Sequence, residues 1–422
     1  MGKSRLTKGR KILILVIYLL TTQLFTYSEY ASLHIGTASV ALCGLFYFFL
    51  LANAKDIRRK CHNNQFTSCY FILLFIILPL LTTVSCYIAH GQSIFDSLWV
   101  MCFHFSISIY FYLIFIGASK EYILRLLTIL MLVKLGLTVA EQFTYPYVPF
   151  TARLVNGYTS DGVFREVEVR SGIYRYTIAD AYYLYMIVGF YSFSKLIKSK
   201  NRGAWLFFLA SCIGIYLDQS RQIMVSFILS LFIISFFQPG KNKIRYLLLF
   251  GIFIVTIYGY YDFLFEELSE KTSDQMDDEN IRFLAYAYYS SNLGDLLTML
   301  FGNGFGGYNS AWGREIAFQE LTMGLNRADI GVVGALHLLG AIFVIVFFAY
   351  YIFVFLKNWR YIDSYIKMMF ISILINIPML FPLYNLPLGG IDFFMGCLYY
   401  LTDKSINENI KSSKLIYKTI AA

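Results

Sequence analysis

Long apolar stretches alternate with short polar loops along nearly the whole chain. A transmembrane helix needs about 20 mostly apolar residues. By that rule the pattern predicts about twelve helical spans, near residues 11–28, 31–53, 67–89, 96–118, 122–141, 178–196, 204–218, 222–238, 245–262, 328–356, 366–384 and 388–402. We therefore expect an all-α, polytopic integral membrane protein in which residues 1–422 form a single membrane domain.

The basic residues predict how this domain is oriented. Lys and Arg accumulate in the cytoplasmic loops of membrane proteins. The segment before the first span is basic, and every second loop after it carries Lys or Arg. The tail, with Lys404, Lys411 and Lys414, follows the same alternation. Both termini are thus predicted to be cytoplasmic. No small-residue cleavage site follows the first apolar run convincingly, so we interpret that run as an uncleaved span.

Two long loops, residues 142–177 and 262–327, fall on the extracytoplasmic side by the same rule. The second is expected to contain one helix from Glu279 to Met299, ended by the glycine-rich stretch 301–308. Arginine in outer loops needs an explanation, because it normally lies inside. Guanidinium is always charged and binds phosphate oxygens in a bidentate manner, which indicates an anionic, phosphorylated, membrane-borne substrate. The arginines concerned are Arg153, Arg165, Arg170, Arg175, Arg282, Arg314 and Arg327.

Composition agrees with this interpretation and narrows the function. The 422 residues are 58% hydrophobic and only 14% charged, against about 25% charged in soluble domains. The net charge of +9 does not indicate nucleic-acid binding, because most basic residues lie in short loops that set topology. The seven cysteines include no C-x-x-C pair and the five histidines are scattered. We therefore predict neither a metal site nor a cofactor.

Arg221 is the most informative single residue. It lies in a link of only a few residues, Asp218 to Arg221, between two predicted spans. An ionisable group at that depth is a candidate for function, because burying it unpaired costs several kcal/mol. The alternative is that Arg221 reaches lipid phosphate or pairs with Asp218 without any catalytic role.

Other charged residues lie where the outer loops meet the membrane. If the loops fold over the mouth of the bundle, these groups converge near Arg221 and suit a diphosphate leaving group with a hydroxyl acceptor. Arginines would neutralise the departing diphosphate, and Asp329 would take the proton of the acceptor. The residues are Arg170, Arg175, Arg282, Arg327 and Asp329. The alternative, which we favour for Arg153 and Arg165, is pairing with loop carboxylates. We interpret His337 chiefly as a packed core histidine, with a catalytic role as the lesser possibility.

Three stretches resemble the bacterial O-antigen polymerase and ligase superfamily, and within it the Wzy-type polysaccharide polymerases. The first is Arg170-Ser171-Gly172 before a span, and the second is Ser220-Arg221 in the short outer link. The third begins at Glu279 and continues through the glycine-rich stretch to Asp329 and Gly340. Together with the topology, the resemblance covers most of the chain.

The resemblance implies transfer of a glycan from an undecaprenyl diphosphate carrier on the outer face of the inner membrane, without ATP or metal. A polymerase extends another lipid-linked repeat unit, whereas a ligase transfers the glycan to lipid A–core. Ligases usually have a histidine near the position of Asp329, so the aspartate favours a polymerase. The Arg-x10-Gly loop motifs of some polymerases are not found in either long loop. The implied partners are the lipid-linked oligosaccharide, membrane lipid and a chain-length regulator protein.

The prediction is therefore a membrane glycosyltransferase that polymerises a surface polysaccharide. Arg170, Arg175, Arg221, Arg282 and Arg327 would bind the diphosphates, with Asp329, Arg221 and Arg282 as the catalytic group. Tyr174, Tyr308 and Trp312 would contact the glycan.

Alternatives are a ligase and a flippase for lipid-linked oligosaccharides. A flippase should carry charges inside its central spans. Here the charges within spans are few, Lys134 being the clearest, and the polar residues lie in the outer loops. A membrane acyltransferase would need a histidine in a polar intramembrane setting, for which His104 is a weak candidate.

Overall fold

The computed structural model describes most of the helical bundle. The described residues are 35–102, 104–144, 181–198, 203–218, 220–237, 281–307, 309–383 and 390–421, with short strands between 153 and 177 and the isolated residues 9, 13–15, 18 and 251. The predicted spans 11–28 and 245–262 lie largely outside these residues.

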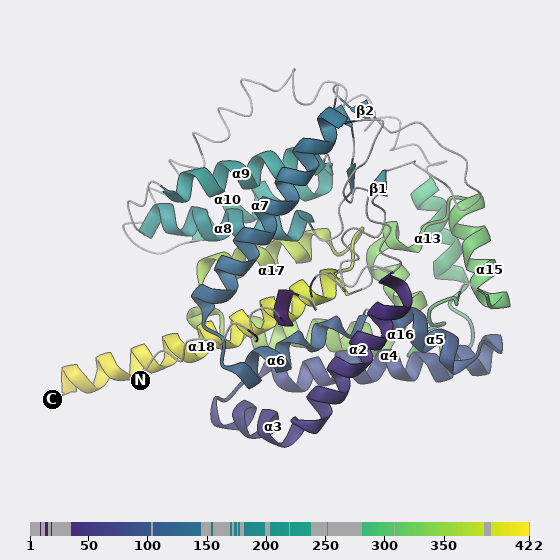
Figure 1. The fold of residues 1–422 in the computed structure, drawn as a ribbon, viewed down its shortest axis with the longest axis horizontal. Coiled ribbons are helices and arrows are strands. Elements are labelled where there is room, and N and C mark those ends of the chain that lie inside the picture. The colour runs from purple at the N-terminus through teal and green to yellow at the C-terminus, as the bar shows by residue number, and fades with distance from the viewer. Residues whose placement is uncertain are drawn as a thin grey trace.

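Helices make up almost all of the described structure (Figure 1). They are α2 (Ile35–Ala52), α3 (Ala54–Asn63), α4 (Ser68–His90), α5 (Ile94–Met101), α6 (Ile109–Ile116), α7 (Lys120–Thr144), α8 (Ala181–Lys198), α9 (Gly203–Asp218), α10 (Arg221–Phe237), α13 (Ile281–Ser291), α14 (Leu296–Phe301), α15 (Ala311–Ala317), α16 (Gly331–Tyr350), α17 (Ser364–Asn376) and α18 (Gly390–Ala421). Short 3-10 or π segments are η1 (His104–Ser108), η2 (Phe318–Thr322), η3 (Arg327–Ile330), η4 (Tyr351–Leu356) and η5 (Trp359–Tyr361).

Three helical segments are long and apolar enough to cross a membrane: Ser68–His90, Lys120–Thr144 and Arg327–Leu356. The pair Ile94–Met101 and His104–Ile116, bent by 56°, would make a fourth if it forms one span. The remaining long helices coincide in position with predicted spans, and α9 and α10 are joined by the tight link expected before Arg221. The fold is thus that of a helical, membrane-protein-like bundle, while the number of twelve spans stays a prediction.

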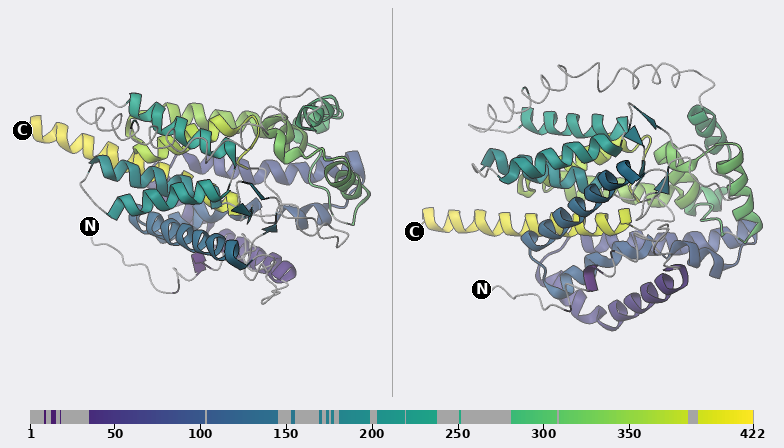
Figure 2. Two further views of the ribbon diagram at one scale, coloured as in Figure 1. Left: turned by 90° about the horizontal axis from the view of Figure 1, so that it is seen from above. Right: turned by 45° about the horizontal axis from the view of Figure 1, so that its top comes forward.

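The bundle has two distinct ends (Figures 1 and 2). α13 and α15 lie at one end, and the C-terminal part of α18 extends from the opposite end. α8 packs between α9 and α17, and α17 packs on α10. α4 contacts α16, and α18 contacts η1 and α6.

Short strands and a two-helix segment stand where the long loops were predicted. β1 (Arg153–Leu154) pairs antiparallel with β4 (Tyr176–Thr177), and β2 (Val169–Arg170) pairs with β3 (Ile173–Tyr174). In the second loop, the expectation of one helix from Glu279 to Met299 was wrong. The chain instead forms α13 and α14, separated at Gly294, whose φ of +82° does not fit a helix. Asp295 then starts α14 by accepting a hydrogen bond from the backbone N–H of Thr298.

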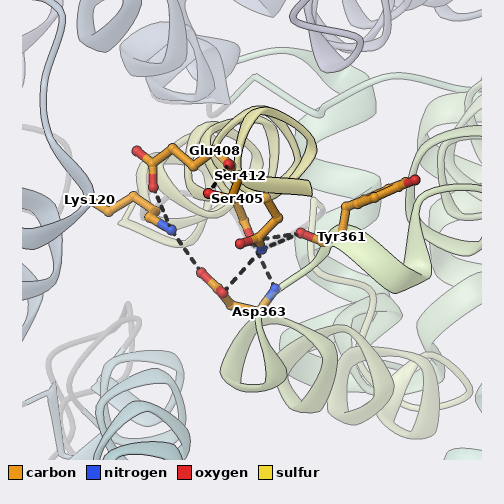
Figure 3. Close-up of polar contacts among 7 residues, drawn as sticks. Lys120, Tyr361, Asp363, Ser405, Glu408 and Ser412 are labelled. Carbon is orange, nitrogen blue, oxygen red and sulfur yellow. Dashed lines mark hydrogen bonds and ion pairs between the residues drawn. The ribbon is translucent and has the colours of Figure 1, made fainter. Parts of the chain in front are cut away.

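A polar network holds together the N-terminus of α7, the start of α17 and the middle of α18 (Figure 3). The Lys120 ammonium lies 2.9 Å from a carboxylate oxygen of Asp363 and 2.8 Å from one of Glu408. Ser405 accepts the backbone N–H of Asp363, and Asn409 donates to the carbonyl of Tyr361 at 2.7 Å. The basic residue and its partners lie on the side that the charge pattern assigns to the cytoplasm.

Asp403 fixes α18 to the start of α4. Its carboxylate accepts hydrogen bonds from the backbone N–H of Ser68, the Thr67 hydroxyl at 3.1 Å and the Tyr110 hydroxyl at 2.6 Å. A carboxylate at a helix N-terminus is favoured by the unpaired N–H groups there. Burial nevertheless raises the pKa of Asp403 to about 6.

Candidate functional site

Three consecutive backbone carbonyls gather the elements that carry the predicted site residues. The carbonyl of Asn376 accepts the Gln222 side-chain amide at 3.0 Å, and that of Ile377 accepts the backbone N–H of Val332 at 3.1 Å. The carbonyl of Pro378 accepts the hydroxyl of Tyr286. The last turn of α17 and the residues after it therefore join α10, α16 and α13 at one place.

Each of these donors lies close in sequence to a predicted site residue. Gln222 follows Arg221, the first residue of α10, whose side chain is partly buried. Tyr286 lies four residues after Arg282 on α13, and residues at that spacing share one face of a helix. Val332 lies three residues after Asp329. The structure thus brings together the elements bearing Arg221, Arg282 and Asp329, which lie 61 and 47 positions apart along the sequence (282 minus 221 and 329 minus 282).

Arg282 and Asp329 are exposed, and their elements pack on one another. η3, which contains Asp329, contacts both α13 and the start of α16. Asn326 shapes η3 by accepting the backbone N–H of Ala328 on its side chain at 3.1 Å. The carboxylate of Asp329 is therefore presented at the surface, at the end of the bundle where α13 and α15 lie.

Arg327 differs from Arg282 because it is buried and held by a carboxylate. Its Nε donates to a Glu320 oxygen at 2.7 Å, and its side chain is 7% exposed against 28% for Glu320. A buried ion pair of this kind fixes geometry more surely than it adds stability. Arg327 is consequently placed to support the site electrostatically rather than to move freely toward a substrate.

Four rings form what we call the outer aromatic cluster: His90, Tyr289, Trp312 and His337. The rings of His90 and Trp312 stack with centroids 3.6 Å apart, and the His337 ring meets Tyr289 edge-on at 4.8 Å. The Tyr289 hydroxyl donates to the carbonyl of Leu325 at 2.9 Å, and its burial raises the pKa of that hydroxyl. His337 is thus packed, as interpreted from the sequence, but beside the predicted site.

Two ring nitrogens of this cluster lack a hydrogen-bond partner within the described part of the chain: Nδ1 of His337 and Nε1 of Trp312. A buried polar atom left unpaired costs about 1–3 kcal/mol, so each one calls for an explanation. The His337 ring also lies near enough to Arg327 to feel its charge. Both atoms are also inaccessible from the surface, so a substrate would reach them only if the cluster rearranged.

The glycine-rich segment after α14 supports the cluster by filling a break in α16. Gly340 has φ +80° and ψ 166°, which interrupts the helical hydrogen bonds. The backbone N–H groups of Asn303 and Gly304 donate to the freed carbonyls of His337 and Leu338 at 2.9 and 3.0 Å. Contact this close requires glycine, because a Cβ on Gly302 would lie 2.2 Å from the Leu338 oxygen.

Gln92, which the sequence did not single out, holds the other end of the glycine-rich segment. Its amide nitrogen donates to the Phe305 carbonyl at 2.7 Å, and its oxygen accepts the Gly307 N–H at 2.8 Å and the Ser310 hydroxyl at 2.6 Å. A buried glutamine with both amide atoms satisfied makes a rigid connection. An isolated Gln between two apolar runs gives no local signal of this role.

The first long loop predicted from the sequence, residues 142–177, contributes less to the described site. Tyr174 is half-buried, and its backbone N–H and carbonyl bond to the Gln142 side chain at 3.0 and 2.7 Å. Arg170 lies on β2, paired in register with Ile173. The remaining predicted site residues of the two loops, Arg175 and Tyr308, lie outside the described residues.

Trp312 is placed differently from what stacking on a sugar requires. Its side chain is buried and one ring face is covered by His90. A glycan would therefore reach the ring only after rearrangement. The structure does not favour the predicted glycan contact of Trp312.

An ion pair inside the bundle was not predicted from the sequence. Nδ1 of His104 lies 3.3 Å from Oδ1 of Asp392, with the side chains 2% and 4% exposed. Lys134 and Glu141 on α7 are also buried. Charged groups inside the described bundle are thus more numerous than Lys134 alone, and this weakens the sequence argument against a flippase.

The chemistry available at the outer site is electrostatic and acid–base. Within the described ranges, no group of three or more His, Cys, Asp and Glu side chains is placed to hold a metal ion. The described groups suited to an anionic substrate are the guanidinium groups of Arg221, Arg282 and Arg327, with Asp329 as an exposed base.

Fold and composition define a helical protein that contains helices apolar enough to cross a membrane. No protein-family model matches the chain, and no curated protein matches it significantly.

Proposed function

We propose that the protein is a bacterial inner-membrane glycosyltransferase that polymerises oligosaccharide repeat units carried on undecaprenyl diphosphate. The observation that supports this most is the joining of α10, α13 and α16 at the carbonyls of Asn376, Ile377 and Pro378. These contacts gather the elements that bear Arg221, Arg282 and Asp329. A set of guanidinium groups next to a carboxylate suits the departure of a diphosphate and the activation of a hydroxyl.

In the proposed reaction an acceptor sugar hydroxyl attacks the anomeric carbon of the donor glycan. The bond from that carbon to the diphosphate oxygen breaks, and its electron pair leaves with the diphosphate. Asp329 takes the hydroxyl proton. Arg221 and Arg282 stabilise the charge that develops on the diphosphate, assisted by Arg170 and Arg175 of the first outer loop.

Arg327 has a supporting part in this proposal. Because Glu320 holds its Nε at 2.7 Å, Arg327 contributes positive potential from a fixed position. A rearrangement of the outer aromatic cluster on binding would expose the buried Nδ1 of His337 and Nε1 of Trp312 to hydroxyl groups of the glycan. Tyr174 and Tyr308 remain proposed glycan contacts, and a chain-length regulator remains a proposed partner.

A ligase would use the same groups on a lipid A–core acceptor, and Asp329 in place of a histidine favours the polymerase. A flippase is the second candidate, and a specific observation supports it. The buried His104–Asp392 pair is the kind of intramembrane ionisable site found in transport proteins.

The test is the surface-polysaccharide ladder of a deletion strain complemented with wild type, Arg221→Ala or Arg282→Ala. Removing one such donor typically slows a reaction about 10²–10³-fold, so both variants should leave core bearing a single repeat unit. Arg314→Ala is the matched control, because Arg314 is exposed on α15 and donates to the Asn309 carbonyl. It should restore the ladder.

Other phenotypes of the deletion strain would distinguish a ligase or a flippase from the proposed polymerase. Bare core in the deletion strain would identify a ligase, and accumulation of lipid-linked repeat units on the cytoplasmic side would identify a flippase. A full ladder from Arg221→Ala and Arg282→Ala at normal membrane levels would overturn the proposed mechanism.

A further inference from the structure

Two cysteine thiols face each other where α3 gives way to α4. Sγ of Cys69 lies 2.9 Å from Sγ of Cys61. Both residues are buried, at 9% and 6% exposure. Cys61 lies near the end of α3, and Cys69 is the second residue of α4. The two sulfur atoms are thus in direct contact without being bonded.

The turn between the cysteines is fixed on both sides. Gln65 adopts φ +52°, an unusual conformation for a residue other than glycine, and this turns the chain back on itself. The backbone N–H of Phe66 donates to the Cys61 carbonyl at 3.0 Å, and the Phe66 ring packs edge-on against Tyr400. The hydrogen bonds from Thr67 and Ser68 to Asp403 hold the far side. The sulfur contact is therefore part of a rigid turn.

The contact favours the thiolate form of one of the two cysteines. The Cys69 thiol donates to the Cys61 sulfur, and this hydrogen bond lowers the pKa of Cys61 despite its burial and the nearby Asp403. The thiolate is the nucleophilic form of cysteine, and redox-active cysteines combine thiolate character with a neighbouring resolving thiol.

We propose that Cys61 and Cys69 form a redox-active dithiol that closes to an intramolecular disulfide when a peroxide reaches the cytoplasmic end of the bundle. The Cys61 thiolate attacks one oxygen of hydrogen peroxide, the O–O bond breaks, and hydroxide leaves, which gives a sulfenic acid on Cys61. The Cys69 sulfur then attacks the Cys61 sulfur and the S–O bond breaks, so that water leaves. In sum, two thiols are oxidised to one disulfide and one peroxide is reduced to two waters.

The geometry needs little change to form this bond. A disulfide has a sulfur–sulfur distance of about 2.05 Å, so the atoms must approach by less than about 1 Å. A Cys61–Cys69 disulfide would restrict the turn from which Thr67 and Ser68 donate hydrogen bonds to Asp403. The modification therefore acts on the joint between α3, α4 and α18, far from the outer site.

The experiment uses the full-length protein in detergent, reduced and then treated with equimolar hydrogen peroxide. Remaining thiols are blocked with N-ethylmaleimide before digestion and mass spectrometry. We expect a peptide linking Cys61 to Cys69, lighter than the reduced pair by two hydrogen atoms and cleaved by dithiothreitol. Cys212→Ser, which removes a thiol of α9, should form the same link.

Two results of the peroxide treatment would contradict the proposed disulfide. Blocked thiols at both Cys61 and Cys69 after peroxide treatment would overturn the proposal, as would sulfinic acid on Cys61 without any link. Cys69→Ser should convert Cys61 to an unresolved sulfenic acid that a dimedone probe captures. The main test is whether the wild-type protein forms the Cys61–Cys69 disulfide. It uses no variant, so misfolding of a variant cannot affect its result.

Discussion

His104 and Asp392 form an ion pair inside the helical bundle, with Nδ1 of His104 3.3 Å from Oδ1 of Asp392. The other ring nitrogen of His104 lies 3.2 Å from the carbonyl oxygen of Phe75. Both neighbouring oxygen atoms carry negative charge, so the imidazolium form of His104 suits both contacts. The pair joins η1, at the bend between α5 and α6, to α18 and α4.

Replacing one partner should therefore be much more damaging than replacing both. We expect His104→Gln or Asp392→Asn alone to lower the apparent stability by about 3–5 kcal/mol, because a buried charge is left uncompensated. The double variant should lose clearly less than the sum, with an interaction energy of about 1–3 kcal/mol. Thermal unfolding of the four purified forms measures this cycle. Strict additivity would show that the two side chains do not interact.

Asp403 should make stability depend on pH. Because burial raises its pKa from 3.8 to about 6, the folded protein holds this proton more tightly than the unfolded chain. The contribution is full below about pH 4 and disappears as pH rises through about 6, a change of about 3 kcal/mol. Asp403→Asn should abolish this fall in stability between about pH 4 and 7.

The exposed cap residue Asp295 provides a control of opposite sign. Hydrogen bonds from Thr298, the backbone N–H first, lower the pKa of Asp295. Its contribution is therefore present at neutral pH and is lost as the solution becomes acidic. If Asp295→Asn and Asp403→Asn changed the melting profile in the same direction, the assignment of Asp403 would be wrong.

The break in α16 should depend on glycine at position 340. A Cβ there would lie 2.3 Å from the Leu300 carbonyl oxygen, and the backbone φ of +80° is unfavourable for alanine. We expect Gly340→Ala to destabilise the protein by more than about 1 kcal/mol. Gly136→Ala is the matched control, because Gly136 lies in α7 with open space around it and alanine favours helix by about 0.5–1 kcal/mol. Equal melting temperatures for the two variants would contradict the structure.

Gln92 should control the order of the glycine-rich segment. Gln92→Leu keeps a side chain of similar size but removes the partners of the Phe305 carbonyl and the Gly307 N–H. Each buried group left unpaired costs about 1–3 kcal/mol. Hydrogen exchange should therefore become faster in residues 303–313 and stay unchanged in α8. Unchanged exchange in both regions would show that Gln92 does not hold this segment.

The sequence predicted those features that depend on local composition. Apolar runs located the helices, because a span must bury its own backbone hydrogen bonds whatever its neighbours are. The short link before Arg221 followed from two runs separated by only a few residues. The break at Gly294 was missed, since a glycine inside a helical pattern lowers the expectation of a helix without excluding it.

The sequence by itself determined that this chain is helical, contains segments apolar enough for a membrane, and carries arginines in its two long polar segments. Only the tertiary structure decided which of these residues meet. His104 and Asp392 are 288 positions apart (392 minus 104), and the carbonyls of Asn376 to Pro378 reach three helices from distant parts of the chain. Helix formation depends on neighbours three and four residues apart. Which helices contact one another depends on how their whole side-chain faces pack. A local sequence pattern does not contain that information.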